Sequence, residues 1–293
     1  MLSGIVRNLS PAGPAWTIAG LIILVAIAAL LLVFTIKHTS KRKLNGLLLD
    51  LELEGPDPGR YRELREALTI KLPCEVPSLG NTKLTLDYVH FTQSDSLSVA
   101  AGDVDFVLLS PQGTPWHRYT GDAAAQLEML KQQLREMALQ KEVPLLGICG
   151  GHQFLAMAFG GAVDFIDPTY TGAISERYPR EAIGEKGPVV LQTVRDDPIF
   201  HGITVHPGKF CTMQSHYEEV KTVPHPFVNL ARSSLCEAQL MRIPGRLVYG
   251  MAFHPERGWQ CQDGPEEERQ AGKQLLANFV QMVIAAKASK GRK

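Results

Sequence analysis

The sequence offers little that would build a disulfide framework, a zinc site or a nucleic-acid interface. Its five cysteines are widely spaced and contain no C-x-x-C pair, so neither disulfides nor zinc are predicted and a reducing compartment suits them. An excess of one charge is also missing, because 30 basic and 30 acidic side chains leave a formal net charge of +0. That balance argues against nucleic acid as a partner. No residue pattern calls for a metal ion or another cofactor, so none is predicted.

One long hydrophobic run lies near the N-terminus. From Trp16 to Ile36 the chain has 21 residues without a charge, which at about 1.5 Å per helical residue spans the roughly 30 Å hydrocarbon layer of a bilayer. A cleaved signal peptide is the alternative, but its apolar region is typically about 7 to 15 residues long. We therefore expect a single transmembrane helix over 16–36, in contact with lipid.

Basic residues on either side of this run predict its orientation. Arg7 is the only charged side chain before it, whereas four basic side chains follow closely, at Lys37, Lys41, Arg42 and Lys43. Since basic residues accumulate on the cytoplasmic side, the larger C-terminal part is expected in the cytoplasm. The expected organisation is an extracytoplasmic tip over 1–15, the membrane helix over 16–36, a basic juxtamembrane linker over 37–44, one α/β domain over 45–287 and a basic tail over 288–293.

After Leu44 the pattern becomes one of short apolar runs that alternate with helical stretches, which is typical of a mainly parallel sheet. Strands are predicted over 46–53, 84–91, 104–109 and 143–148, and further short apolar runs follow at 189–194, 227–231, 237–242 and 247–253. Helices are predicted over 59–69, 121–140 and 266–286. The sequence therefore predicts an α/β fold with a mixed, mainly parallel sheet and helices on both faces.

The clearest chemical motif is V-P-L-L-G-I-C-G-G-H-Q-F-L at 143–155. A buried strand runs into Cys149, and small glycines then open a helix, which is the pattern of a nucleophile elbow. The tight turn would lift the thiol out of the sheet, and the helix N-terminus would stabilise its thiolate form. Gly150 would leave room for substrate, so that its backbone N–H can face a developing oxyanion.

A second motif, V-Y-G-M-A-F-H-P-E at 248–256, supplies the groups that such a thiolate needs. A cysteine nucleophile requires a base that accepts and returns a proton, and that imidazole requires a carboxylate to hold its orientation. His254 and Glu256 are two residues apart, so an extended segment would place both on one face, with Pro255 pointing the other way.

Together these motifs resemble those of the class I glutamine amidotransferases. G-I-C-G-G-H-Q at 147–153 is similar to the family signature G-x-C-x-G-x-Q, and 248–256 resembles G-x-x-F-H-P-E, with Ala252 where glutamine is common. The resemblance covers roughly 45–286 and implies a flavodoxin-like fold. It also implies that Cys149, His254 and Glu256 form the catalytic triad.

Two further stretches resemble binding elements of that family. D-F-V-L-L-S-P-Q-G-T-P at 105–115 is similar to the strand and oxyanion loop, which implies that the backbone N–H of Gln112 or Gly113 joins Gly150 in the oxyanion hole. C-T-M-Q-S-H-Y-E-E-V at 211–220 resembles the region that holds the amino-acid end of glutamine. The candidate substrate-binding residues are Gln153, Ser215, His216 and Tyr217.

The predicted function is a membrane-anchored glutaminase that releases ammonia from the side-chain amide of glutamine. The sequence carries no synthetase, kinase or ligase module, so the ammonia would pass to a separate synthase or ligase subunit, which could itself be membrane-associated. Two alternatives remain open at this point. One is a γ-glutamyl peptidase or hydrolase with the same triad, and the other is a non-catalytic, membrane-tethered scaffold subunit.

Overall fold

The computed structural model describes residues 23, 42–97, 104–170, 183–203, 208–260 and 271–290. The predicted tip and all of the predicted membrane span except Ile23 lie outside these residues, as do the last three residues of the predicted tail. Within the described residues, no helix combines the length and the apolar character that crossing a bilayer requires.

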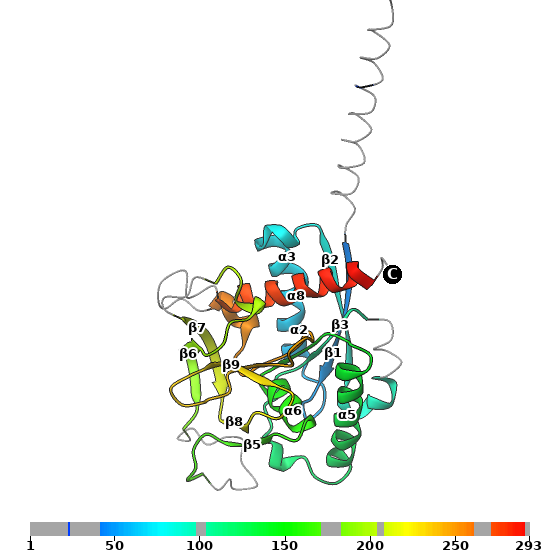
Figure 1. Cartoon of the computed structure of the whole chain (residues 1–293). Coiled ribbons are helices and arrows are strands. Elements are labelled where there is room, and N and C mark those ends of the chain that lie inside the picture. Colours follow the sequence, from blue (N-terminus) through cyan, green and yellow to red (C-terminus); the bar gives the residue numbers. More distant parts are fainter. Residues whose placement is uncertain are drawn as a thin grey trace, which may run out of the picture. The chain divides into compact units, whose positions relative to one another are not determined.

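A nine-stranded sheet forms the centre of the domain, with the strand order β2-β1-β3-β4-β11-β10-β9-β6-β7 (Figure 1). Strands β1, β3, β4 and β11 run parallel to one another, whereas β10, β9, β6 and β7 continue the sheet with antiparallel pairings. The prediction of a mixed sheet with a parallel part is therefore confirmed. The strands of this sheet are β1 (Arg42–Asp50), β2 (Thr82–His90), β3 (Phe106–Leu109), β4 (Leu145–Ile148), β6 (Glu185–Thr193), β7 (Lys209–His216), β9 (Val228–Arg232), β10 (Leu240–Arg242) and β11 (Val248–Met251).

Helices cover both faces of the sheet, as predicted. One face packs against α2 (Pro58–Glu66), α3 (Leu72–Glu75) and α8 (Ala271–Lys290), and the other against α5 (Gly121–Leu139) and α6 (Gly150–Ala158). Alternate side chains of β1 divide between the two cores: Leu48 belongs to the first, Leu47 and Leu49 to the second. This division follows from the two-residue period of a strand and explains why the parallel strands read as continuous apolar runs.

A small second sheet pairs β5 (Ala162–Phe165) with β8 (Glu218–Thr222) in antiparallel fashion. In Figure 1 it lies below the main sheet, beyond the end of α6. Strand β8 follows β7 after a single residue, Tyr217, so the two strands carry the 211–220 motif from one sheet into the other. Short 3-10 turns complete the domain: η2 (Pro77–Leu79), η3 (Phe91–Ser96), η5 (Trp116–Arg118), η6 (Pro198–Phe200) and η7 (Pro255–Gln260).

Several predicted boundaries are wrong by a few residues. Strand β1 starts at Arg42 rather than at residue 46, so the end of the predicted linker belongs to the sheet, with Arg42 and Lys43 exposed at its tip. The helix predicted over 59–69 begins at Pro58 and continues through a π-helical turn, η1 (Ala67–Lys71), into α3. Leu68 and Leu72 explain the continuation, because side chains four residues apart share a helix face and both are buried.

Candidate active site

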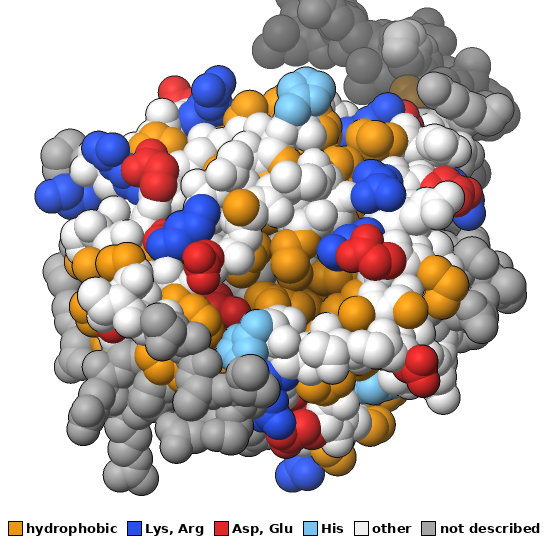
Figure 2. Space-filling model, turned by 90° about the horizontal axis from the view of Figure 1, so that it is seen from below, with side chains coloured by type: hydrophobic (Ala, Val, Ile, Leu, Met, Phe, Trp, Pro, Cys, Tyr) orange, Lys and Arg blue, Asp and Glu red, His pale blue; other side chains and the backbone are white. Residues whose placement is uncertain are grey.

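The carboxyl ends of the parallel strands β1, β3, β4 and β11 meet at one edge of the sheet, where α/β proteins commonly bind their ligands. β1 runs from the top of Figure 1 towards its lower side, so this edge faces downward in that view. Figure 2 shows the molecule from below, where its face is hollowed. Hydrophobic side chains line the hollow, and acidic and basic side chains lie close together around it.

Cys149 lies between the end of β4 and the first residue of α6, in the turn that joins the two elements. Its backbone has φ 51° and ψ −106°, a left-handed conformation that a residue with a side chain adopts only under strain. The amide of Cys149 donates to the carbonyl of Met251 in β11 (2.7 Å), which ties the turn to the neighbouring strand. The predicted strand, turn and helix around this cysteine are therefore present.

Three glycines allow the turn to pack closely against its surroundings. A methyl group on Gly147 would overlap the backbone of Gly151, and one on Gly151 would overlap Leu109 in β3. A methyl group on Gly150 would overlap the side chain of Gln112 and lie 2.9 Å from its backbone nitrogen. The close approach between the elbow and the 105–115 loop therefore requires glycine at these positions.

His254 follows β11 and is joined to Glu256 by a hydrogen bond of 2.6 Å between Nδ1 and Oε1. Both side chains are buried. The prediction of an extended segment is wrong, because Pro255 begins the 3-10 turn η7. Proline suits the first position of a helix, where its fixed φ is already helical and its missing N–H is not needed. The predicted proximity of the two side chains holds, but a turn produces it.

Charge couples Cys149 to this histidine. Burial would raise the pKa of the Cys149 thiol, but the charge and hydrogen bond of His254, together with the charge of His216, outweigh burial, so the pKa is lower than usual. Burial would likewise lower the pKa of His254, and the charges of Glu256 and Cys149 outweigh it and raise that pKa. The arrangement favours a thiolate beside an imidazolium. Since Glu256 occupies Nδ1, Nε2 of His254 is the nitrogen left to exchange a proton with Cys149 or with a substrate.

The two candidate oxyanion donors of the 105–115 loop have different surroundings. The backbone N–H of Gly113 donates to Glu52 Oε2 at 2.7 Å, so it is already engaged. The backbone nitrogen of Gln112 instead lies close to Gly150, as the close approach described above shows. Gly150 is the first residue of α6, where the backbone N–H has no acceptor within the helix. Gln112 and Gly150 are thus the pair that the structure brings together.

Gln153 and His216, both predicted to bind substrate, have their polar atoms engaged within the protein. Gln153 accepts from Trp116 Nε1 (2.6 Å) and donates to the Glu218 carbonyl (2.7 Å). His216 contacts the Glu218 carbonyl through Nδ1 (2.9 Å) and Glu185 Oε2 through Nε2 (3.1 Å). These contacts connect η5, α6 and β8, so they support the walls of the site.

Ser215 and Tyr217 precede and follow His216 in the sequence, so their side chains point away from the side on which His216 lies. The Ser215 carbonyl is 4.0 Å from the Cys149 sulfur, and its side chain is exposed. Tyr217 is partly exposed, and Lys186 Nζ lies 4.6 Å from the centre of its ring. Of the four predicted substrate-binding residues, Ser215 is therefore the one placed beside the nucleophile with an exposed side chain.

One group of described residues has the side-chain types and spacing of a metal site. The ligand atoms of Glu185, His216 and Cys236 lie within 4.8 Å of one another, and all three residues are buried. Both His216 nitrogens are already engaged, and Glu185 also accepts from Gln239 Nε2 (2.5 Å). Burial would lower the pKa of His216, but the Glu185 hydrogen bond and the charges of Cys149 and Glu185 outweigh burial and raise that pKa. The group has the character of a buried hydrogen-bond network beneath the nucleophile.

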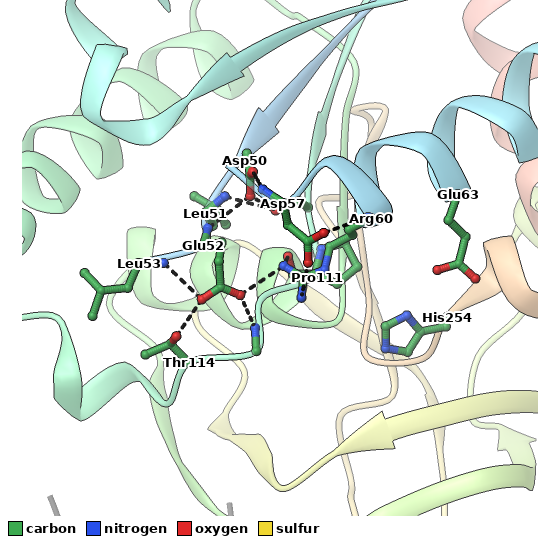
Figure 3. A network of polar contacts seen from close by, with 12 residues as sticks. Asp50, Leu51, Glu52, Leu53, Asp57, Arg60, Glu63, Pro111, Thr114 and His254 are labelled. Atoms are coloured by element: carbon green, nitrogen blue, oxygen red, sulfur yellow. Dashed lines mark hydrogen bonds and ion pairs between the residues drawn. The ribbon is translucent and has the colours of Figure 1, made fainter. Parts of the chain in front are cut away.

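Sequence reasoning missed the carboxylate of Glu52, which follows β1. It accepts from the Thr114 hydroxyl (2.5 Å), the Gly113 amide (2.7 Å) and Arg60 Nη1 (3.0 Å). Figure 3 shows this network, which joins the end of β1 to the beginning of α2 and to the 105–115 loop. The available signal was position: an acidic residue just after a parallel strand lies at the edge where such sites form.

Comparison with known proteins identifies a family that matches this chain. The family model "Glutamine amidotransferase class-I" matches residues 76–270. A glutamine-hydrolyzing GMP synthase subunit from Methanopyrus kandleri is 37% identical over 144 residues, which cover 49% of this chain and 63% of that protein. Its counterpart from Methanosarcina acetivorans is 31% identical over 144 residues, covering 48% and 60%. The chain thus spans less than two thirds of the length of these relatives.

Solved structures share the fold. A putative GMP synthase subunit from Thermoplasma acidophilum superposes with a TM-score of 0.57 at 21% identity, covering 85% of this chain and 98% of that one. A glutamine amidotransferase from Thermotoga maritima superposes with a TM-score of 0.55 at 19% identity, covering 82% and 98%. At these identities the likeness concerns the arrangement of helices and strands.

Proposed function

We propose, from the premise that this chain belongs to the class I glutamine amidotransferase family, that it hydrolyses the side-chain amide of glutamine at Cys149. The observation that carries the proposal is the geometry at the sheet edge. Cys149 occupies a strained turn at φ 51°, and a buried imidazole held at 2.6 Å by Glu256 shifts its charge state. Similar proteins carry the words "glutamine-hydrolyzing" in their names, which supports this activity.

The first half of the reaction forms a thioester. The Cys149 thiolate attacks the amide carbon, so that a carbon–sulfur bond forms and the carbonyl electrons move onto oxygen. The backbone N–H groups of Gln112 and Gly150 stabilise this oxyanion. The His254 imidazolium then donates its proton to the amide nitrogen, the carbon–nitrogen bond breaks and ammonia leaves.

The second half restores the enzyme. His254, now neutral, takes a proton from water, and the resulting hydroxide adds to the γ-glutamyl thioester. The carbon–sulfur bond breaks, glutamate leaves, and the thiolate and imidazolium are regenerated together. Throughout the cycle Glu256 holds the imidazole orientation and stabilises its positive form. Ser215, exposed beside the nucleophile, is the candidate contact for the amino-acid end of glutamine.

We further propose that the ammonia passes to a separate synthase or ligase subunit. The similarity to proteins named as one subunit of a GMP synthase supports a divided enzyme. The uncharged run at 16–36, followed by basic residues, supports a membrane anchor with the domain over 45–287 in the cytoplasm. The anchor would bring the glutaminase to a partner at the membrane.

Two measurements test these proposals. Glutamate release by the full chain is compared for glutamine and for γ-glutamyl peptides, and a preference for the peptides would replace the proposal with a γ-glutamyl hydrolase. Cross-linked pull-down from membranes with Cys149→Ala, against the same chain lacking residues 1–41, tests partner and anchor. Equal membrane recovery of both chains would contradict the anchor, and recovery of the chain alone would contradict the partner.

A further inference from the structure

Contacts on both sides of the Gln112 amide hold it in place, and both are made by the ion pair of Arg60 and Glu52. The carbonyl before it, of Pro111, accepts from Arg60 Nη1 at 3.1 Å. The amide after it, of Gly113, donates to Glu52 Oε2 at 2.7 Å. Arg60 and Glu52 are themselves paired at 3.0 Å. The peptide units on either side of Gln112 are therefore held by two side chains that contact each other (Figure 3).

Glu52 is anchored well enough to act as a fixed support. Its carboxylate also accepts from the Thr114 hydroxyl at 2.5 Å, and its own backbone carbonyl contacts His90 Nε2 at 2.7 Å. Burial would raise the pKa of Glu52, but the hydrogen bonds from Thr114, Gly113 and Arg60 outweigh it and lower the pKa. The carboxylate is thus charged and buried, with partners for both oxygens.

Arg60 is held in the same way. Asp57 caps the N-terminus of helix α2, and its side chain accepts from the Arg60 amide at 3.0 Å and lies 3.3 Å from Arg60 Nη2. The guanidinium therefore contacts Asp57, Glu52 and the Pro111 carbonyl at once. The planar guanidinium makes these hydrogen bonds in fixed directions, whereas a lysine ammonium would not fix the directions of its hydrogen bonds.

The position of Gln112 is the one that the proposed chemistry depends on. Its backbone nitrogen lies so close to the first turn of α6 that a methyl group on Gly150 would be 2.9 Å from it. Oxyanion donors act through placement, since they must already point at the oxygen where charge develops. A donor that could rotate away would stabilise the oxyanion less well.

We infer that Glu52 and Arg60 are positioning residues, which hold the Gln112 amide in the oxyanion hole from both sides. The inference rests on the proposed function, because it assigns these residues to the same reaction. Both precede residue 76, where the family match begins. They act through the loop, so a change at Glu52 should impair oxyanion stabilisation while the nucleophile keeps its reactivity.

The test compares wild type, Glu52→Gln, Arg60→Lys and the control Glu75→Gln, each as the full chain in detergent. Glutamine replaces one carboxylate oxygen with an amide NH2 group, which meets the Gly113 or Thr114 donor with another donor. Glu75 also pairs with a basic residue, Lys273 at 3.1 Å, but on the surface and away from the loop. Five quantities are measured: kcat and KM for glutamine, binding of glutamate γ-semialdehyde, alkylation of Cys149 by iodoacetamide, and hydrogen exchange of the 110–114 amides.

For Glu52→Gln we expect kcat to fall about 10- to 100-fold with KM changed less than about threefold, as for loss of an oxyanion donor. Binding of the aldehyde, whose adduct with the thiol carries an oxyanion, should weaken similarly. Alkylation, which needs no oxyanion hole, should stay within about twofold, and exchange of the Gly113 amide should accelerate. Arg60→Lys should have the same effects at smaller size, and Glu75→Gln should have none.

Unchanged kcat and unchanged Gly113 exchange in Glu52→Gln would overturn the inference, as would loss of alkylation in parallel with kcat, which indicates general damage. Failure of the proposed function looks different. Wild type would then release no glutamate and bind no aldehyde, while hydrogen exchange would still report whether Glu52 fixes the loop.

Discussion

His254 Nδ1 lies 2.6 Å from Glu256 Oε1 although the chain turns into a 3-10 helix between the two residues. The turn has a consequence for the imidazole: the carboxylate occupies Nδ1, and Nε2 is left for Cys149 and the substrate. A ring held in this way can exchange a proton only through Nε2. The first two predictions depend on this relationship.

Replacing Cys149 with serine should abolish covalent labelling by a diazo-ketone analogue of glutamine. Serine places a much weaker nucleophile at the same turn, and His254 cannot supply the thiolate chemistry. Labelling is measured by mass spectrometry of the intact chain and its peptides. Cys74→Ser is the control, because Cys74 is an exposed thiol away from the site. Equal labelling of wild type and Cys149→Ser would remove the proposed mechanism.

His254→Gln should move the pH dependence of Cys149 alkylation to higher pH. In the wild type the charge and hydrogen bond of His254, with the charge of His216, outweigh burial and lower the pKa of Cys149, so the thiolate persists as the pH falls. Without that charge, burial raises the pKa, and the thiolate forms only at higher pH. Glutaminase activity should drop by about 10²- to 10⁴-fold with the loss of the general acid and base. The exposed His201→Gln is the control; an unshifted profile in His254→Gln would contradict the coupling.

Gly150→Ala should strongly reduce glutaminase activity. Its new methyl group would overlap the Gln112 side chain and approach the Gln112 nitrogen to 2.9 Å, so the loop must move. We expect kcat to fall about 10²-fold or more, as when an oxyanion donor is displaced. Gly80→Ala is the matched control, since its nearest contact would be an ordinary 3.4 Å. Full activity in Gly150→Ala would show that turnover does not need the close approach between Gly150 and Gln112.

Gln153→Ala should lower the free energy of unfolding by about 1–3 kcal/mol, because Trp116 Nε1 and the Glu218 carbonyl each lose a partner. Urea denaturation of the full chain measures this difference. Gln281→Ala, which removes one exposed hydrogen bond to Ser78, should change it by less than about 0.5 kcal/mol. A raised KM with unchanged stability would instead support the direct substrate contact that the family resemblance implied.

The sequence was most informative where structure is determined by neighbouring residues. The run from Val143 to Ile148, with glycines around Cys149, predicts a buried strand, a sharp turn and a helix, because each property is local. The same holds for α5, whose apolar residues at helical spacing face the core. The H-P-E spacing predicted the contact between His254 and Glu256 correctly but the backbone conformation wrongly. Both an extended segment and a turn can bring those side chains together.

The rest depends on contacts between distant segments. Glu52 and Gly113 are separated by 61 positions, and no local pattern indicates that a carboxylate after β1 will reach that amide. Gln153 and His216 matched a family motif, but only the fold shows that their polar atoms are used by Trp116, Glu185 and Glu218. The antiparallel order of β10, β9, β6 and β7 is likewise a matter of long-range pairing.

Strand β1 lies between β2 and β3, inside the sheet, yet it precedes the first residue of the family match. A recombinant fragment trimmed to 76–270 would therefore lack an interior strand. Without β1, strand β3, whose four residues are all buried, would become an unpaired apolar edge strand. Exposed apolar edge strands pair with strands of other molecules. We expect that fragment to aggregate during expression, and recovery in soluble form to require a starting point upstream of Arg42.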